Sequence, residues 1–136
     1  MNILEEIARL NFPVDQYVVV GSGPMAAHGI RDVHDIDIVV TPELFEICKQ
    51  RDWEHMPWTY PGKEGEIYLR NGIVELYLDV NAGDFNPTFQ ELFDRSEVVQ
   101  SIHFASLEDI MRFKKAYNRP KHLEDIQKIK EHLTEA

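Results

Sequence analysis

Apolar and polar positions along the chain follow two periods, and these periods predict alternating strands and helices. Tyr17–Val20 is a continuous run of β-forming apolar residues, which is typical of a strand buried on both faces. Stripes of apolar residues at helical spacing alternate with such runs. Strands are predicted over 17–20, 32–40, 66–70, 73–80 and 96–104. Helices are predicted over 2–10, 24–28, 42–50, 86–94, 106–117 and 123–133, and the aromatic segment 53–60 is predicted as a loop that runs into a strand.

This order of elements predicts the fold class. Strands and helices interleave, which predicts an α/β (α+β) fold with a mixed β-sheet flanked by helices. Asn71-Gly72 lies between two β-rich runs and predicts a hairpin, because both residues accept positive φ angles. A length of 136 residues is that of one domain with one core. We therefore expect a single domain over residues 1–136, in which two C-terminal helices, about 106–134, pack on the core.

Capping residues mark where two of these helices begin. Thr41-Pro42-Glu43 combines an N-cap, a first-turn proline and a first-turn acid, so a helix is expected to begin at Pro42. Ser106-Leu107-Glu108-Asp109 is a variant of the capping box with aspartate at the third position, which predicts a helix directly after Ser106.

Composition and charge exclude several classes of protein. The net charge of −10 argues against non-specific binding of DNA or RNA. No apolar run approaches the roughly 20 residues that span a bilayer, and the N-terminus has no signal-peptide pattern. One cysteine, Cys48, excludes an internal disulfide and suits the cytoplasm. The histidines show no zinc-binding spacing.

Two carboxylates lie close together in the predicted strand 32–40. Residues two apart on a strand point to the same face, so Asp35 and Asp37 are expected side by side while the isoleucine between them faces the core. Adjacent carboxylates repel each other, and a hard divalent cation, Mg2+ or Mn2+, takes oxygen ligands and commonly brings phosphates with it. The turn just before, Gly21-Ser22-Gly23, offers backbone N–H groups to a phosphate.

Further charged residues lie later in the chain. The second strand of the predicted hairpin carries Glu75 and Asp79 on one face, so it is a second strand with carboxylates at alternate positions. Positive charge gathers in one C-terminal segment, at Arg112, Lys114, Lys115, Arg119 and Lys121. A local basic patch in an acidic protein is consistent with binding a small polyanion such as a nucleotide.

Taken together, these motifs resemble the signature of the nucleotidyltransferase superfamily, whose fold is that of the catalytic domain of DNA polymerase beta. The signature is an apolar strand, Gly-Ser, a spacer, then acid-apolar-acid-apolar, with a third acid on a nearby strand; Gly21-Ser22, Asp35-Ile36-Asp37-Ile38 and Glu75 match it. The segment SLEDIMRFKKAYNRPKHLEDI is similar to the tail of small bacterial members, which include minimal nucleotidyltransferases and abortive-infection-type toxins. The resemblance runs from Val18 to about Ile129, although His122 stands where many relatives have aspartate.

The resemblance implies a metal-dependent enzyme that transfers an NMP from an NTP such as ATP to a hydroxyl and releases pyrophosphate. It implies that the catalytic and metal-binding acids are Asp35, Asp37 and Glu75. Asp79, on the same strand face as Glu75, is the other candidate for the third acid. It implies that the NTP is bound by Gly21, Ser22, Gly23, Arg31 and Lys114. The acceptor would be a small molecule or a protein. A partner chain or a homodimer is also expected, since only two helices remain after the core to hold an acceptor.

Two other functions stay open at this point. A protein of this fold can bind without catalysis, as an antitoxin-like partner or a regulatory module. A metal-dependent phosphodiesterase such as a ribonuclease fits the paired carboxylates, but the acidic net charge and the phosphate turn count against it.

Overall fold

The computed structural model of the protein describes residues 1–59 and 62–135, so Tyr60, at the end of the predicted segment 53–60, Pro61 and Ala136 lie outside the described residues. The strands are β1 Tyr17–Val20, β2 Ile36–Val40, β3 Glu54–Pro57, β4 Ile67–Asn71, β5 Val74–Tyr77, β6 Glu97–Val99 and β7 Ile102–Phe104. The helices are α1 Ile3–Ala8, α2 Gly23–Ala27, α3 Pro42–Lys49, α4 Phe89–Asp94, α5 Leu107–Tyr117 and α6 Leu123–Thr134, with a 3-10 turn η1, Pro120–His122.

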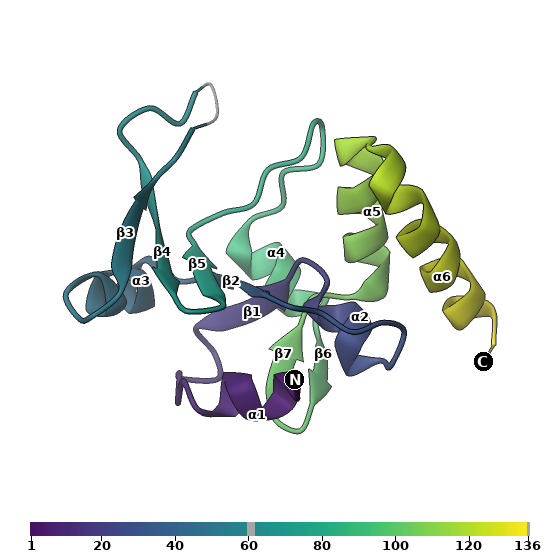
Figure 1. Ribbon diagram of the computed structural model, residues 1–136, viewed down its shortest axis with the longest axis horizontal. Coiled ribbons are helices and arrows are strands. Elements are labelled where there is room, and N and C mark those ends of the chain that lie inside the picture. The colour runs from purple at the N-terminus through teal and green to yellow at the C-terminus, as the bar shows by residue number, and fades with distance from the viewer. Residues whose placement is uncertain (60–61, 136) are drawn as a thin grey trace.

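The described strands form one mixed sheet of seven strands, in the order β3-β4-β5-β2-β1-β7-β6. In Figure 1 the hairpin of β3 and β4 lies at one end of the molecule, and α5 and α6 lie at the other. The predicted α/β class, with a mixed sheet flanked by helices, is confirmed. None of the helices within the described residues is long and apolar enough to cross a membrane.

β2 is the strand that organises the centre of the sheet. It pairs antiparallel with β1, with Val20 opposite Asp37. It pairs in parallel with β5, with Asp37 opposite Glu75. Residues from three separate parts of the chain, Val20, Asp37 and Glu75, therefore lie side by side near the beginning of β2.

Both faces of the sheet are covered, which explains why β1 is apolar at every position. Val19 points to a core closed by α1 and α3, while Val18 and Val20 point to a second core closed by α4, α5 and α6. All four residues of β1 are buried, as its uninterrupted apolar sequence predicts.

Both predicted helix caps are also observed. The Thr41 hydroxyl accepts a hydrogen bond from the Leu44 N–H, and the Ser106 hydroxyl accepts one from the Asp109 N–H. The helix predicted from Asn86 begins later, because Thr88 forms a capping box with Glu91 and starts α4 at Phe89.

The hairpin of β4 and β5 is present, but the predicted Asn71-Gly72 loop is wrong by one residue. Asn71 pairs with Val74, so the two loop residues are Gly72 and Ile73. Gly72 takes the first loop position with a φ angle of +60°, a conformation that suits glycine. β5 begins at Val74 because that residue is also in register with Ile36 of β2.

Two other predicted strands have different bounds. The strand expected over 32–40 begins only at Ile36, which pairs with Val74, the first residue of β5 after the hairpin loop. The strand expected over 96–104 is a hairpin of β6 and β7, and its turn residues Gln100 and Ser101 have φ angles of +48° and +67°.

The observed loop predicts that two neighbouring substitutions change the free energy of unfolding by different amounts. Gly72→Ala places a Cβ on a residue with positive φ and is expected to lower the free energy of unfolding by about 1 kcal/mol. Asn71→Ala lies in the strand and is expected to change it by less than about 0.5 kcal/mol. Urea unfolding of both variants measures the difference, and an Asn71→Ala variant that is the less stable of the two would support the Asn71-Gly72 loop instead.

Candidate active site

The turn after β1 is built on glycines that lie too close to other atoms to carry a side chain. Gly21 has a φ angle of +65°, and a Cβ atom there would lie 2.6 Å from Oδ2 of Asp37. A Cβ atom at Gly23 would lie 2.6 Å from a side-chain atom of β1. Ser22 precedes α2 without capping it, and its Oγ lies 3.4 Å from Nζ of Lys114 instead. The turn therefore lies directly against the Asp37 carboxylate and presents the Ser22 hydroxyl to a cation.

Strand pairing determines which acids come together. Glu75 lies beside Asp37, because β2 and β5 pair in parallel with these residues in register. Asp35 is exposed and directly precedes β2, yet its charge still acts on Asp37. Asp79 follows β5, and its carboxylate accepts a hydrogen bond from Nζ of Lys63 at 2.7 Å. Of the two candidates for a third acid, Glu75 is the one placed beside Asp37.

The environment of Asp37 disfavours its negative charge. Burial is the largest cause that raises the pKa of Asp37, which is about 7, and the charges of Asp35 and Glu75 act in the same direction. A hydrogen bond from Tyr77 opposes them. The Tyr77 Oη lies 3.4 Å from Oδ1 of Asp37 and donates to the Glu75 carboxylate. Burial, and then the charge of Asp37, raise the pKa of the Tyr77 phenol, so this phenol is protonated while the site holds no ligand.

A buried cation lies on the other side of the turn. Lys114 is only 6% exposed, and its Nζ lies 3.0 Å from Oδ2 of Asp125, which α6 supplies. Arg31 donates to the same oxygen at 2.8 Å. Burial alone would raise the pKa of Asp125, but the hydrogen bond from Lys114 and the charges of Lys114 and Arg31 hold it below its ordinary value. Asp125 therefore stays ionised and keeps Lys114 beside Ser22.

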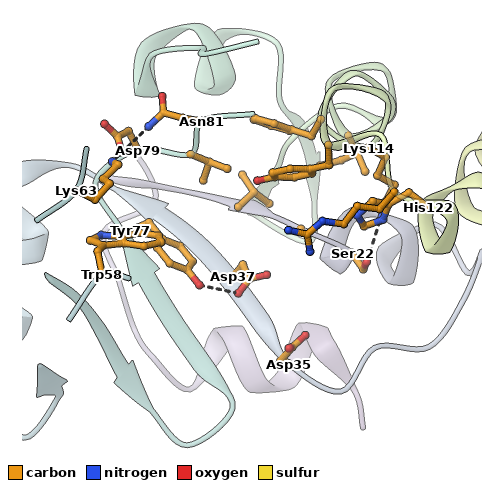
Figure 2. Close-up of a pocket in the computed structure, with 17 residues that line it drawn as sticks. Ser22, Asp35, Asp37, Trp58, Lys63, Tyr77, Asp79, Asn81, Lys114 and His122 are labelled. Atoms are coloured by element: carbon orange, nitrogen blue, oxygen red, sulfur yellow. Dashed lines mark hydrogen bonds and ion pairs between the residues drawn. The ribbon is translucent and has the colours of Figure 1, made fainter. Parts of the chain in front are cut away.

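Several of these groups line a cavity of about 560 Å³, shown in Figure 2. The predicted site residues that line it are Gly21, Ser22, Asp35, Asp37 and Lys114. In Figure 2, Asp37 lies between Tyr77 and Ser22, while Asp35 lies apart where the chain enters β2. The predicted site residues outside the described lining are Gly23, Arg31 and Glu75.

Many residues of the cavity wall were not predicted as site residues from the sequence. The unassigned lining residues include Trp58, Lys63, Tyr77, Asn81, Arg119 and His122. Arg119 belongs to the basic segment that the sequence marks out, whereas Arg112 of that segment pairs with Asp109 outside the cavity lining. Asp125 was also missed, because in sequence it is an ordinary first-turn acid of a helix.

The residue types at the site suit a hard divalent cation. Mg2+ and Mn2+ bind carboxylate oxygens, which Asp35, Asp37 and Glu75 offer. Burial first, and then the charges of Asp35 and Glu75, raise the pKa of Asp37, and a bound cation would offset those negative charges. Across residues 1–59 and 62–135, however, no group of three or more His, Cys, Asp and Glu side chains is arranged to hold a metal ion. The donors fit the cation, and Glu75 would have to leave the Tyr77 hydroxyl to join them.

The contact between the turn and Asp37 predicts that two glycine substitutions lower the free energy of unfolding by different amounts. Gly21→Ala and Gly29→Ala both place a Cβ at a positive φ, +65° and +70°, so each is expected to lose about 1 kcal/mol of stability. Only the Gly21 Cβ meets Asp37, whereas the Gly29 Cβ meets nothing within 4 Å. Gly21→Ala should therefore lose measurably more in urea unfolding, and equal losses would contradict the close approach of the turn.

The raised pKa of Asp37 predicts how its contribution to stability depends on pH. The folded protein binds this proton more tightly than the unfolded chain, whose ordinary value is 3.8, so the contribution is fully present below about pH 4 and is lost as the pH rises to about 7. Asp37→Asn is expected to match the wild type in urea unfolding at pH 4 and to exceed it at pH 8 by roughly 1–3 kcal/mol, a range reduced by partial access of water.

The exposed acid Asp15 provides the control for this experiment. Asp15→Asn should differ from the wild type by the same small amount at both pH values. If Asp37→Asn gains no stability over the wild type between pH 4 and pH 8, the environment of Asp37 does not oppose its charge.

Comparison with known proteins identifies a similar fold but no matching protein family. The chain matches no protein-family profile and no curated protein in sequence. Among solved structures it is similar to the crystal structure of ANT(2")-Ia in complex with adenylyl-2"-tobramycin, with a TM-score of 0.55 and 20% identity over 97% of this chain and 86% of that chain. ANT(2")-Ia is an aminoglycoside nucleotidyltransferase. The protein therefore has a nucleotidyltransferase-like fold.

Proposed function

We propose that the protein is a metal-dependent nucleotidyltransferase that transfers an NMP from an NTP to the hydroxyl of an acceptor. The observation that carries this proposal is the meeting, in one cavity, of the Gly21-Ser22 turn, Asp37 on β2 and Lys114 on α5. Phosphoryl transfer needs a phosphate-binding backbone, carboxylates for a metal and a fixed cation, because catalysis here is mostly positioning and charge stabilisation. The nucleotidyltransferase-like fold supports the same function.

The cationic side of the cavity is the proposed site of the triphosphate. Lys114 brings a positive charge to the turn, and Asp125 holds it in place, so little side-chain entropy remains to be lost on binding. Arg119 and His122 line the same cavity. Burial, and then the charge of Lys114, lower the pKa of His122, which makes it a neutral hydrogen-bonding partner at neutral pH. Arg31 binds Asp125, so we assign it to holding Lys114 rather than to the NTP.

The acidic side is the proposed site of the metal and of the reaction. Asp35 and Asp37 would hold Mg2+ or Mn2+, which when bound offsets the charge of the triphosphate. Glu75 lies beside Asp37, and we assign to it the proton of the attacking hydroxyl. The acceptor oxygen attacks the α-phosphorus, the bond from that phosphorus to the bridging oxygen breaks, and pyrophosphate leaves with the electron pair.

A small molecule is the acceptor that the cavity supports best. Its volume of about 560 Å³ falls within the usual range for small-ligand pockets. One wall combines the rings of Trp58 and Tyr77 with the polar side chains of Asp79 and Asn81. The ligand bound to ANT(2")-Ia is an adenylyl group joined to tobramycin, a reason to test ATP first. A protein acceptor, a partner chain, a homodimer and a cytoplasmic location remain predictions from the sequence.

Binding without catalysis is a second candidate, and one observation favours it. Glu75 accepts a hydrogen bond from Tyr77, and the described residues hold no prearranged group of metal ligands. A nucleotide could occupy the cavity of such a protein without being consumed.

Calorimetry and a transfer assay distinguish these functions. We expect the wild type to bind an NTP only with Mg2+ or Mn2+ present, and Asp37→Asn to weaken this binding at least about tenfold, because a metal-binding charge is lost. Asp15→Asn, which removes an exposed charge outside the cavity lining, is expected to bind as the wild type does. Circular dichroism of each variant checks that it is folded.

The transfer assay uses α-labelled NTPs with hydroxylated small molecules. Label that moves to an acceptor in the wild type, but not in Asp37→Asn, supports the enzyme. Metal-dependent binding with no transfer to any acceptor or to the protein favours the second candidate. Absence of metal-dependent NTP binding in the wild type would sink the proposal.

A further inference from the structure

A hydroxyl of the protein itself lies where the proposed reaction needs one. Tyr77 extends from β5 into the cavity, and its Oη donates a hydrogen bond to the Glu75 carboxylate. The same oxygen lies 3.4 Å from Oδ1 of Asp37. Glu75 is the residue assigned to take a proton from an attacking hydroxyl, so the phenol already occupies the position of an acceptor.

The two oxygens of Asp37 face the two halves of the site. Oδ2 faces the Gly21 turn, where a Cβ would lie only 2.6 Å away. Oδ1 faces the Tyr77 hydroxyl. A phosphoryl group bound at the turn and the phenol of Tyr77 would thus be separated by the width of one carboxylate.

The ring of Tyr77 is also fixed in this position. Its centroid lies 5.5 Å from that of Trp58 and 5.3 Å from that of Tyr68, and the Trp58 and Tyr68 centroids are 4.9 Å apart. Three aromatic rings in mutual contact restrict one another, so the hydroxyl has little freedom to move away from the acids. A nucleophile held in one orientation reacts with a smaller loss of entropy.

We propose that Tyr77 is itself an acceptor and that the protein transfers one NMP to its own Tyr77 hydroxyl. This inference rests on the proposed nucleotidyltransferase function and uses the same NTP. The Tyr77 Oη attacks the α-phosphorus, and the bond from that phosphorus to the bridging oxygen breaks. Pyrophosphate leaves with the electron pair, and the phenolic proton passes to Glu75, to which it is already hydrogen-bonded.

The product would limit its own formation. A nucleotide joined to Tyr77 through a phosphodiester lies inside the cavity that must admit the next NTP, because Tyr77 lines the same space as Ser22 and Lys114. Labelling should therefore stop at one NMP per chain, and the labelled chain should bind further NTP poorly.

Mass spectrometry of the full chain tests the inference. The protein is incubated with Mg2+ and each NTP without any added acceptor, its intact mass is measured, and its peptides are mapped. We expect a gain of one NMP per chain, located on Tyr77, and at least tenfold less label in Tyr77→Phe. The control is Tyr17→Phe, which removes a phenolic hydroxyl outside the cavity lining and should be labelled as the wild type is.

Calorimetry on the same samples separates this inference from the proposed function. If the wild type binds an NTP with Mg2+ but carries no adduct, or carries it on a residue other than Tyr77, self-modification at Tyr77 is overturned and the nucleotidyltransferase proposal stands. If no NTP binds, both are overturned. An adduct mapped to Tyr77 supports both, whatever external acceptor the protein uses.

Discussion

The Asp37 carboxylate lies half-buried on the central strand of the sheet, and Glu75 is in register with it on the next strand. Burial and two neighbouring negative charges together keep its pKa near 7. The folded chain can relieve this charge with a proton, with the hydrogen bond from Tyr77 or with a cation. Gly21 adds to the constraint, because the backbone comes so close to Asp37 that the carboxylate has little room to move away. The site is thus held in a state that a positive ligand stabilises, which is a common property of functional sites.

Sheet topology explains how so small a chain assembles such a site. Asp37 has Val20 on one side, directly before the turn, and Glu75 on the other, so β2 joins the Gly21-Ser22 turn to Glu75. The parallel pairing of β2 with β5 is the decisive contact, since an antiparallel neighbour would present its opposite end at this edge. α5 then places Lys114 over the turn. Asp37, Glu75 and Lys114 come from two strands and a helix, and such rigid elements hold a site in place better than loops do.

Local signals in the sequence predicted those parts of the fold that depend on local physics. The buried run Tyr17–Val20 and the caps Thr41 and Ser106 are all observed, because burial on two faces and capping need only neighbouring residues. The turn at Gln100 and Ser101 was not predicted, since two residues with side chains take positive φ angles there and no glycine marks the position. The roles of Tyr77 and Asp125 depend on contacts across the chain, and no local pattern identifies those.

Charge is separated across the cavity, and the arrangement of α5 and α6 causes this. Asp125 is one carboxylate shared by two cations, Lys114 and Arg31, so this cluster keeps a net positive charge beside Ser22. The opposite wall, around Asp37, keeps a net negative charge. A metal-bound triphosphate has the complementary polarity, with a cation to face the Asp37 wall and unneutralised phosphate oxygens to face the Lys114 wall. Burying Lys114 without Asp125 would leave an unpaired charge at a cost of several kcal/mol. The last helix, which contributes no residue to the acidic wall, therefore determines whether the cationic wall can exist.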